Sequence, residues 1–235
     1  MRKIIIFIIL QLFVHANQYA QTQKPLKGKS FLIPAVLVIY GLSTYHNNGF
    51  PSSYQVKTYR DLNYKNFNSP IDDVLPFVPI LFNYGLSYSG VKSHSDFTNR
   101  SIIYVKAGVI SLVSVSLIKY GSRVLRPDST AFNSFPSGHT AFAFAMATVM
   151  DHELREQSTL YSVLGYGCAS GVAAMRILNN RHWFSDVLAG AGMGIASGHI
   201  ASHTHTYKWG NFWKGTLISP ILYSNTYGFV VNKKF

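Results

Sequence analysis

The chain has little charge and almost no cysteine. Its one cysteine, Cys168, excludes an internal disulfide framework and a cysteine-rich metal site. Charged residues make up 13% and hydrophobic residues 48% of the 235 residues, which excludes a disordered chain and a coiled coil. Acidic residues are scarcest, with 9 Asp and Glu against 21 Lys and Arg, a net charge of +12. This surplus predicts an anionic partner: nucleic acid, an acidic membrane or a phosphorylated substrate.

The first 20 residues have the pattern of a secretory signal peptide. Arg2 and Lys3 precede the apolar run Ile4–Val14, and small residues follow at Ala16 and Ala20, which are alternative cleavage sites. The run is shorter than the roughly 20 residues that cross a bilayer, although an uncleaved anchor stays open as the alternative. We therefore expect export, with residues 1–20 removed.

Six further apolar segments predict an all-α bundle of about six core helices. They run over Phe31–Thr44, Val74–Tyr88, Ser101–Ile118, Thr140–Met150, Tyr161–Met175 and Val187–Ala201. Buried helices of a soluble bundle and short membrane helices share this pattern, so both remain open. The first segment is short and contains Pro34, and we expect that it does not span a membrane, which would keep the following site outside the cytoplasm.

The remaining segments complete the predicted organisation. Residues 21–70 hold an N-terminal helix and an ordered loop over Asn47–Asp72, and residues 71–205 form the core. In the tail, 206–235, the β-branched and aromatic stretches Thr216–Tyr223 and Tyr227–Phe235 predict a hairpin that would have to pack on the bundle.

Three polar clusters lie between Lys119 and Asp186. In the first, Lys119 and Arg126 are seven residues apart, which predicts that they share one helix face before Pro127 ends the helix. Two cations at one helix end form a site for a dianion, and a solvated basic helix end is the alternative.

The second cluster is the stretch Pro136-Ser137-Gly138-His139. Ser137 is a good N-cap, and the helix that follows offers free backbone N–H groups to an anion. Gly138 allows a ligand close to the backbone, and His139 lies within reach of that ligand. A structural histidine is the alternative for His139 alone.

The third cluster runs from Arg176 to Asp186. His182 and Asp186 are four residues apart, so on a helix the carboxylate reaches one imidazole nitrogen and leaves the other free as a nucleophile or base. Arg176 supplies a planar donor fork suited to phosphate oxygens.

Together, the clusters resemble the type 2 phosphatidic acid phosphatase (PAP2) superfamily over roughly residues 70–205. The matching positions are Lys119…Arg126-Pro127, Pro136-Ser137-Gly138-His139 and Arg176…His182…Asp186. Two departures are Met175, where the family usually has serine, and a short connection between the first two clusters. The surrounding sequence is most similar to bacterial envelope members that act on lipid phosphates, including lipid A phosphatases.

The resemblance implies a phosphatase that needs no cofactor or metal. It implies that His182 is the nucleophile that forms a phosphohistidine, that Asp186 orients it, and that His139 is the acid and base. The phosphoryl oxygens would be held by Lys119, Arg126, Ser137, Gly138 and Arg176. Fixed cations at these oxygens stabilise a phosphoryl-transfer transition state.

The substrate and some histidines remain open. Substrates include lipid monoesters, lipid pyrophosphates and small soluble esters, and rival functions are a vanadate-dependent haloperoxidase and a phospholipid-binding protein. Dispersed basic residues favour an anionic membrane surface over nucleic acid. His199, His203 and His205 have no acidic or cysteine partner nearby in the sequence, so we favour a helix end over a metal site.

Overall fold

A computed structural model describes residues 28–206, 216–223 and 226–233, so the predicted signal peptide lies outside the described residues. Its elements are η1 (Gly28–Phe31), α2 (Leu32–Ser43), α3 (Ser53–Asn63), α4 (Ile71–Val74), η2 (Leu75–Phe77), α5 (Val78–Tyr88), α6 (Phe97–Ser122), α7 (Gly138–Leu154), α8 (Thr159–Leu178), α9 (Phe184–His203), β1 (Thr216–Tyr223) and β2 (Thr226–Lys233).

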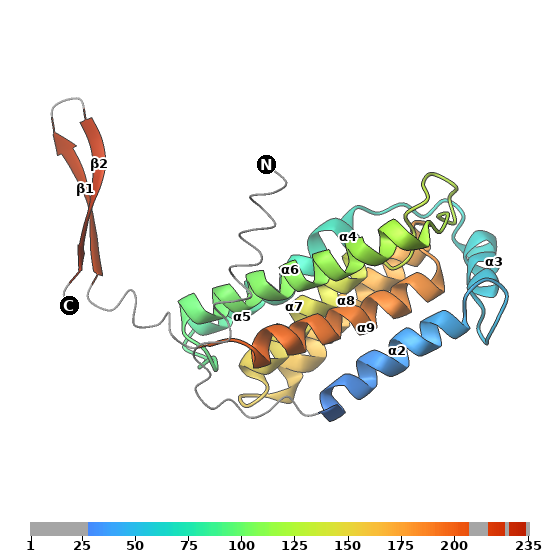
Figure 1. The fold of residues 1–235 in the computed structure, drawn as a ribbon, viewed down its shortest axis with the longest axis horizontal. Coiled ribbons are helices and arrows are strands. Elements are labelled where there is room, and N and C mark those ends of the chain that lie inside the picture. Colours follow the sequence, from blue (N-terminus) through green and yellow to red (C-terminus); the bar gives the residue numbers. More distant parts are fainter. Residues whose placement is uncertain (1–27, 207–215, 224–225, 234–235) are drawn as a thin grey trace.

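Helix α7 is the centre of the bundle, and α5, α6, α8 and α9 pack around it (Figure 1). Its small residues Ala141, Ala143, Ala145 and Ala147 are fully buried, which lets the neighbouring helices approach closely. Helix α2 lies on the outer side of α9. Each of the six apolar segments contains a helix, so the prediction of an all-α bundle is confirmed.

A stripe of glycines on α9 brings α7 and α9 together. Gly190, Gly194 and Gly198 are four residues apart and share one helix face. A Cβ atom at Gly190 would lie 2.7 Å from the carbonyl oxygen of Ser137, and one at Gly194 would lie 2.2 Å from that of Ala141. This packing sets the position of α9 against the first turns of α7.

The loop predicted over Asn47–Asp72 is wrong in part, because it contains α3 and the start of α4. A capping box begins α3: the backbone N–H of Gln55 donates to Ser52 Oγ (3.2 Å), and that of Ser52 donates to Gln55 Oε1 (2.9 Å). Few apolar residues occur in this helix, so no apolar segment indicated it.

Strands β1 and β2 form an antiparallel pair in which Thr216 is opposite Lys233 and Tyr223 is opposite Thr226. They fall in the predicted C-terminal tail. The packing of this tail on the bundle stays a prediction.

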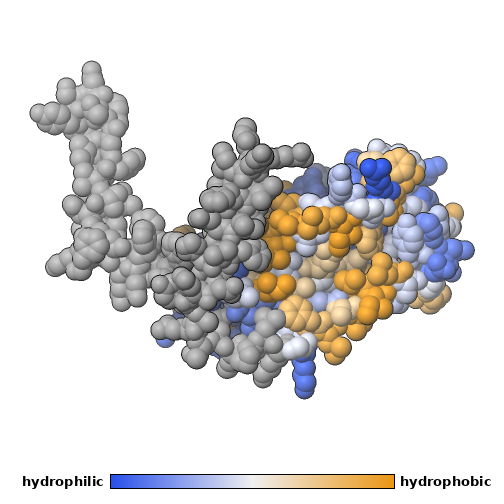
Figure 2. All heavy atoms as spheres, viewed as in Figure 1, coloured by the Kyte–Doolittle hydropathy of each residue, from blue (hydrophilic) through white to orange (hydrophobic). Residues whose placement is uncertain are grey.

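Large apolar side chains cover the outward faces of several helices (Figure 2). Exposed examples are Leu32, Ile33, Val36 and Ile39 on α2, Leu81 and Phe82 on α5, Val105, Val109, Leu112, Val113 and Leu117 on α6, and Leu160, Val163 and Leu164 on α8. Within the described residues, α6 alone is long and apolar enough to cross a membrane, with a mean hydropathy of 2.0 over its most apolar window.

Candidate active site

The three clusters meet at one end of the bundle. Helices α6 and α8 end there, α7 and α9 begin there, and α3 and α4 lie beside them (Figure 1). The same end carries hydrophilic side chains, in contrast to the apolar flank (Figure 2). The fold thus brings together Lys119 and Asp186, which are 67 residues apart in the sequence.

The Pro-Ser-Gly-His segment begins α7 and is tied to α9. Ser137 caps α7, as predicted, because its Oγ accepts a hydrogen bond from the N–H of Thr140 (3.4 Å). The backbone N–H of Ser137 donates to the carbonyl of Asp186 (3.0 Å). A Cβ atom at Gly138 would make only an ordinary contact with Val115, at 3.7 Å, so packing within the chain does not require glycine here.

His182 precedes α9, which corrects the prediction that it shares a helix with Asp186. The helix begins at Phe184, and Asp186 reaches back from its first turn. His182 Nδ1 lies 3.5 Å from Asp186 Oδ2, a contact longer than a hydrogen bond of good geometry. Asp186 Oδ2 accepts hydrogen bonds from the backbone N–H of Trp183 (2.8 Å) and from Ser134 Oγ. The carboxylate is therefore fixed in direction.

The imidazole of His182 is buried among cations. Burial lowers the pKa of His182 to about 4, and the charges of Lys119 and Arg176 act in the same direction against the opposing effect of Asp186. His182 is consequently neutral at neutral pH, and a neutral imidazole has a nitrogen lone pair available for attack.

Lys119 and Arg126 reach this region by a different route from the one predicted. Helix α6 ends at Ser122, and Arg123 takes a left-handed conformation with φ of 46°, so Arg126 lies after the helix and the shared helix face is wrong. Lys119 Nζ donates to the carbonyl oxygens of Asn133 and Ser134.

The cations repel one another across the site. Burial lowers the pKa of Arg126, and the charges of Arg176 and Arg181 add to this effect, whereas Asp128 and Asp186 oppose it. Arg181, to which the sequence assigned no role, pairs with Asp128 (3.2 Å). The Nε atoms of Arg126 and Arg176 are buried and have no hydrogen-bond partner in the described chain. An anion with several oxygens would relieve the repulsion and accept these donors.

Two acidic residues that the motifs did not indicate lie in the site. Arg176 Nη1 pairs with the buried Asp72 (2.8 Å), and His139 Nε2 lies 3.1 Å from Asp73 Oδ1. Both carboxylates come from the short helix α4. The available signal was an Asp-Asp pair in a chain with only nine acidic residues.

An apolar cavity of about 750 Å³ starts at this site and runs between α5, α6 and α7. Asp73, Gly138 and His139 line one end. At the other end, α5 and α6 are joined by hydrogen bonds, including one of 2.6 Å between Tyr84 and Ser101. The helical rise from Ser101 to Val115 gives a length of about 21 Å.

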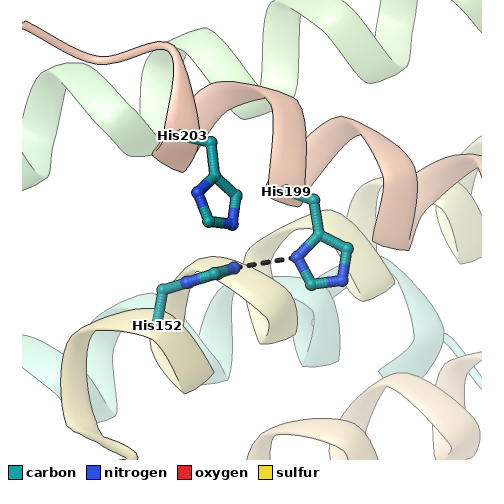
Figure 3. A group of neighbouring side chains, drawn as sticks. All are labelled: His152, His199 and His203. Carbon is teal, nitrogen blue, oxygen red and sulfur yellow. Dashed lines mark hydrogen bonds between the residues drawn. The ribbon is translucent and has the colours of Figure 1, made fainter. Parts of the chain in front are cut away.

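His199 and His203 lie in the last turns of α9, at the helix end that the sequence analysis favoured, and His205 follows the helix. His205 Nε2 contacts Asn99 Oδ1 (2.8 Å), and His199 and His203 are joined instead by His152 of α7 (Figure 3). This group lies at the bundle end remote from His139.

Comparisons with known proteins agree with the geometry. Residues 100–210 match the PAP2 superfamily. The resemblance indicated by the three clusters is thereby confirmed. These matches assign no role to the individual site residues.

The chain is also similar to individual known proteins. A lipid A 1-phosphatase of Porphyromonas gingivalis is 36% identical over 180 residues, which cover 72% of this chain and 40% of that protein. The chain thus spans about two fifths of this relative. The crystal structure of Aquifex aeolicus LpxE has 21% identity and a TM-score of 0.47, covering 62% of this chain and 93% of that one. A transmembrane PAP2 type phosphatidylglycerolphosphate phosphatase of Bacillus subtilis has 15% identity and a TM-score of 0.47, covering 75% and 95%.

Proposed function

We propose that the chain is a phosphatase that hydrolyses a phosphomonoester or pyrophosphate on a lipid, through a phosphohistidine intermediate. The observation that carries this proposal is a buried, neutral His182 beside Asp186, with the charges of Lys119 and Arg176 acting on it. Together with Arg126, these two residues place three cations at one phosphoryl group. They supply the charge stabilisation that many phosphoryl-transfer enzymes obtain from metal ions. We therefore propose a reaction that needs no metal.

In the first step, His182 attacks phosphorus. Nδ1 faces Asp186, which leaves Nε2 as the attacking atom. The N–P bond forms as the bond from phosphorus to the leaving oxygen breaks, and Asp186 stabilises the positive imidazole that results. Lys119, Arg126 and Arg176 hold the phosphoryl oxygens, together with Ser137 and the backbone N–H of Gly138.

In the second step, water replaces His182. His139 protonates the leaving oxygen in the first step and then accepts a proton from the attacking water. Burial and the charge of Arg176 lower the pKa of His139, and Asp73, at 3.1 Å from His139 Nε2, orients that ring and opposes this lowering. The products are inorganic phosphate and the dephosphorylated lipid.

The apolar cavity supports a lipid substrate over a small soluble ester. It begins beside His139 and continues for about 21 Å between helices, where the apolar chain of a lipid would be removed from water. A soluble ester would leave this apolar surface unused. The P. gingivalis relative is a lipid A 1-phosphatase, a name that indicates a substrate of the same class.

We further propose that the domain lies in a membrane of the bacterial cell envelope with its site on the periplasmic side. The exposed apolar faces of α2, α5, α6 and α8 form a belt too extensive for a soluble monomer. The hydrophilic end that holds the site would face water and the anionic head groups (Figure 2). Export by the predicted signal peptide is consistent with the periplasmic side.

Phosphate release by the purified chain in detergent tests the function. We expect turnover of lipid A, phosphatidate or a polyprenyl pyrophosphate that exceeds turnover of a soluble aryl phosphate. His182→Asn should reduce it by at least about 10³-fold, the scale on which single catalytic groups act. His94→Gln, which changes an exposed histidine at the remote end, is the control. Undiminished activity of His182→Asn would overturn the mechanism, and preference for the soluble ester would overturn the lipid assignment.

A further inference from the structure

Three histidines from two helices converge at the end of the bundle remote from the phosphatase site (Figure 3). His199 and His203 are one turn apart on α9 and point towards His152 near the end of α7. One ring nitrogen of each lies within 4.8 Å of the other two. All three side chains are partly buried, so their positions are restrained while water still reaches them.

The spacing is close to that of a metal site. His152 Nε2 and His199 Nδ1 are 2.8 Å apart and form a hydrogen bond. Two nitrogens bound to tetrahedral Zn²⁺ at 2.0–2.1 Å are about 3.3 Å apart. The pair has to separate slightly and His203 has to approach, movements that side-chain rotation can supply.

The hydrogen bond in this group involves only two of its three histidines. One proton between His152 and His199 satisfies two nitrogens and gives His203 no part in the bond. The ring of His203 nevertheless lies edge-on to that of His152, with centroids 5.0 Å apart. A cation at the centre would engage all three rings at once.

We propose that His152, His199 and His203 bind a divalent transition metal of the Zn²⁺ class, which links α7 to α9. Imidazole ligands suit Zn²⁺, Ni²⁺ and Cu²⁺, whereas Mg²⁺ and Ca²⁺ require oxygen ligands that this group lacks. Three protein ligands leave a fourth position, which water fills. The metal would link the helices without taking part in phosphoryl transfer, because His152 is 13 residues from His139, about 20 Å along α7.

Metal binding by the full chain tests the proposal. The protein, without a polyhistidine tag, is freed of metal with EDTA and titrated with Zn²⁺ alone in phosphate-free detergent buffer. We expect one saturable site per chain and a thermal unfolding midpoint that rises with free Zn²⁺, because the metal binds only the folded state. Co²⁺ in the same site should give the strong visible absorption of tetrahedral coordination.

Matched variants locate the site. His203→Ala should weaken Zn²⁺ binding by at least about tenfold, the loss caused even by removing an outer partner of a metal ligand. His94→Gln alters an exposed histidine whose backbone N–H binds Glu153 at the same end, and should retain the site. If His152→Ala does not fold, His203→Ala decides the question. A thermal unfolding transition of His203→Ala in the absence of metal shows that this variant is folded. Unchanged Zn²⁺ binding in His203→Ala would overturn the proposal. These readouts are independent of phosphatase activity.

Discussion

Asp72 and Asp73 determine how the cationic side chains of the site are held in the absence of phosphate. Asp72 pairs with Arg176 and is buried, whereas Asp73 is exposed and faces His139. In the proposed mechanism, Asp72 holds Arg176 in place, and Asp73 presents a charge that an incoming phosphate must displace or share. Residues of this kind act on catalysis through the groups that they position.

Replacement of Asp73 by Asn should lower kcat by about tenfold, less than the loss of a full acid–base catalyst. The carboxylate favours the protonated form of His139. Its removal should therefore move the alkaline limb of the pH–rate profile to lower pH. Steady-state kinetics over a pH series measures both effects. Asp61→Asn, which removes the ion pairs of Asp61 with Lys57 and Arg60 and leaves Asp73 and His139 unchanged, should not alter the profile. An identical profile for Asp73→Asn would remove the positioning role.

The buried His182 should make the fold sensitive to mild acid. Its pKa is lowered to about 4, from an ordinary value of 6.5, so between these pH values the unfolded chain binds the extra proton. Stability contributed by neutral His182 is thus complete above pH 6.5 and is lost as the pH falls towards 4, by about 3 kcal/mol at most. As the pH is lowered from 7 to 4, the midpoint temperature of thermal unfolding should fall more steeply for the wild type than for His182→Asn. Parallel curves would contradict this prediction.

At this scale, the sequence indicated residues whose spacing is local or belongs to a motif. Ser137 was predicted as a cap because the rule involves only the next few residues. Ser134, which donates to Asp186, and His152, which joins His199, were not predicted. Each of these contacts joins separate segments of the chain, and a single sequence does not show which distant segments pack together.

The stripe of glycines on α9 controls the spacing between α7, which carries His139, and α9, which follows His182 and carries Asp186. A Cβ atom at Gly194 would lie 2.2 Å from the carbonyl oxygen of Ala141, which the backbone of α7 cannot accommodate without moving. Gly190 is in a similar position beside Ser137. A change in this stripe therefore acts on the site without touching it.

Gly194→Ala should destabilise the fold by about 1–3 kcal/mol, the usual cost of overpacking, and should lower activity because α7 and α9 separate. Gly167→Ala is the matched control, since it lies on α8 with nothing within 4 Å of the added carbon. That variant should be slightly more stable, because alanine favours a helix. Thermal unfolding and kcat of the two proteins decide the matter. A neutral Gly194→Ala would show that the helices are not held at this distance.

The cavity between α5 and α6 should distinguish lipid from soluble substrates. Val109 lines it, whereas Val113 lies one turn further along α6, is similarly exposed and does not line it. Val109→Trp fills the cavity and should lower kcat/KM for lipid phosphates by about tenfold, which corresponds to about 1.4 kcal/mol of lost apolar contact. Turnover of an aryl phosphate should not change. Equal effects of Val109→Trp and Val113→Trp would exclude the cavity as the lipid site.

Among the elements, apolar runs predicted the bundle helices, and polar ones were missed. The helix α3 is held by its capping box and by a hydrogen bond from Arg60 Nε to the carbonyl of Leu178 (2.9 Å). Neither the capping box nor this hydrogen bond produces a periodic apolar pattern in the sequence. The end of α6 was placed too late because Pro127 was taken as the stop, although the helix ends at Ser122 before the left-handed Arg123.

On the scale of the whole molecule, the exposed apolar belt and the hydrophilic site end support the proposed placement in a membrane. The belt comprises outward faces of α2, α5, α6 and α8, while α7 is enclosed. Transfer of this apolar surface from lipid into water would be unfavourable in proportion to its area. Aqueous washes should therefore remove little of the protein from a membrane.

The full chain should remain with membranes after washes with high salt and alkaline carbonate, and detergent should release it. Ionic attachment through the net charge of +12 alone would be screened by salt. Membrane fractionation followed by immunodetection measures this. Release by salt would show that the apolar belt is covered by something other than lipid.

The central helix gives the two proposed sites separate surroundings. His139 stands at the first turn of α7 and His152 near its last, about 20 Å apart along the axis, most of the roughly 30 Å thickness of a hydrocarbon core. In the proposed placement, these two ends lie towards opposite faces of the membrane. Phosphate freed by hydrolysis, itself a ligand for Zn²⁺, would then be discharged on the side away from the metal, so turnover would not deplete the ion that links the helices.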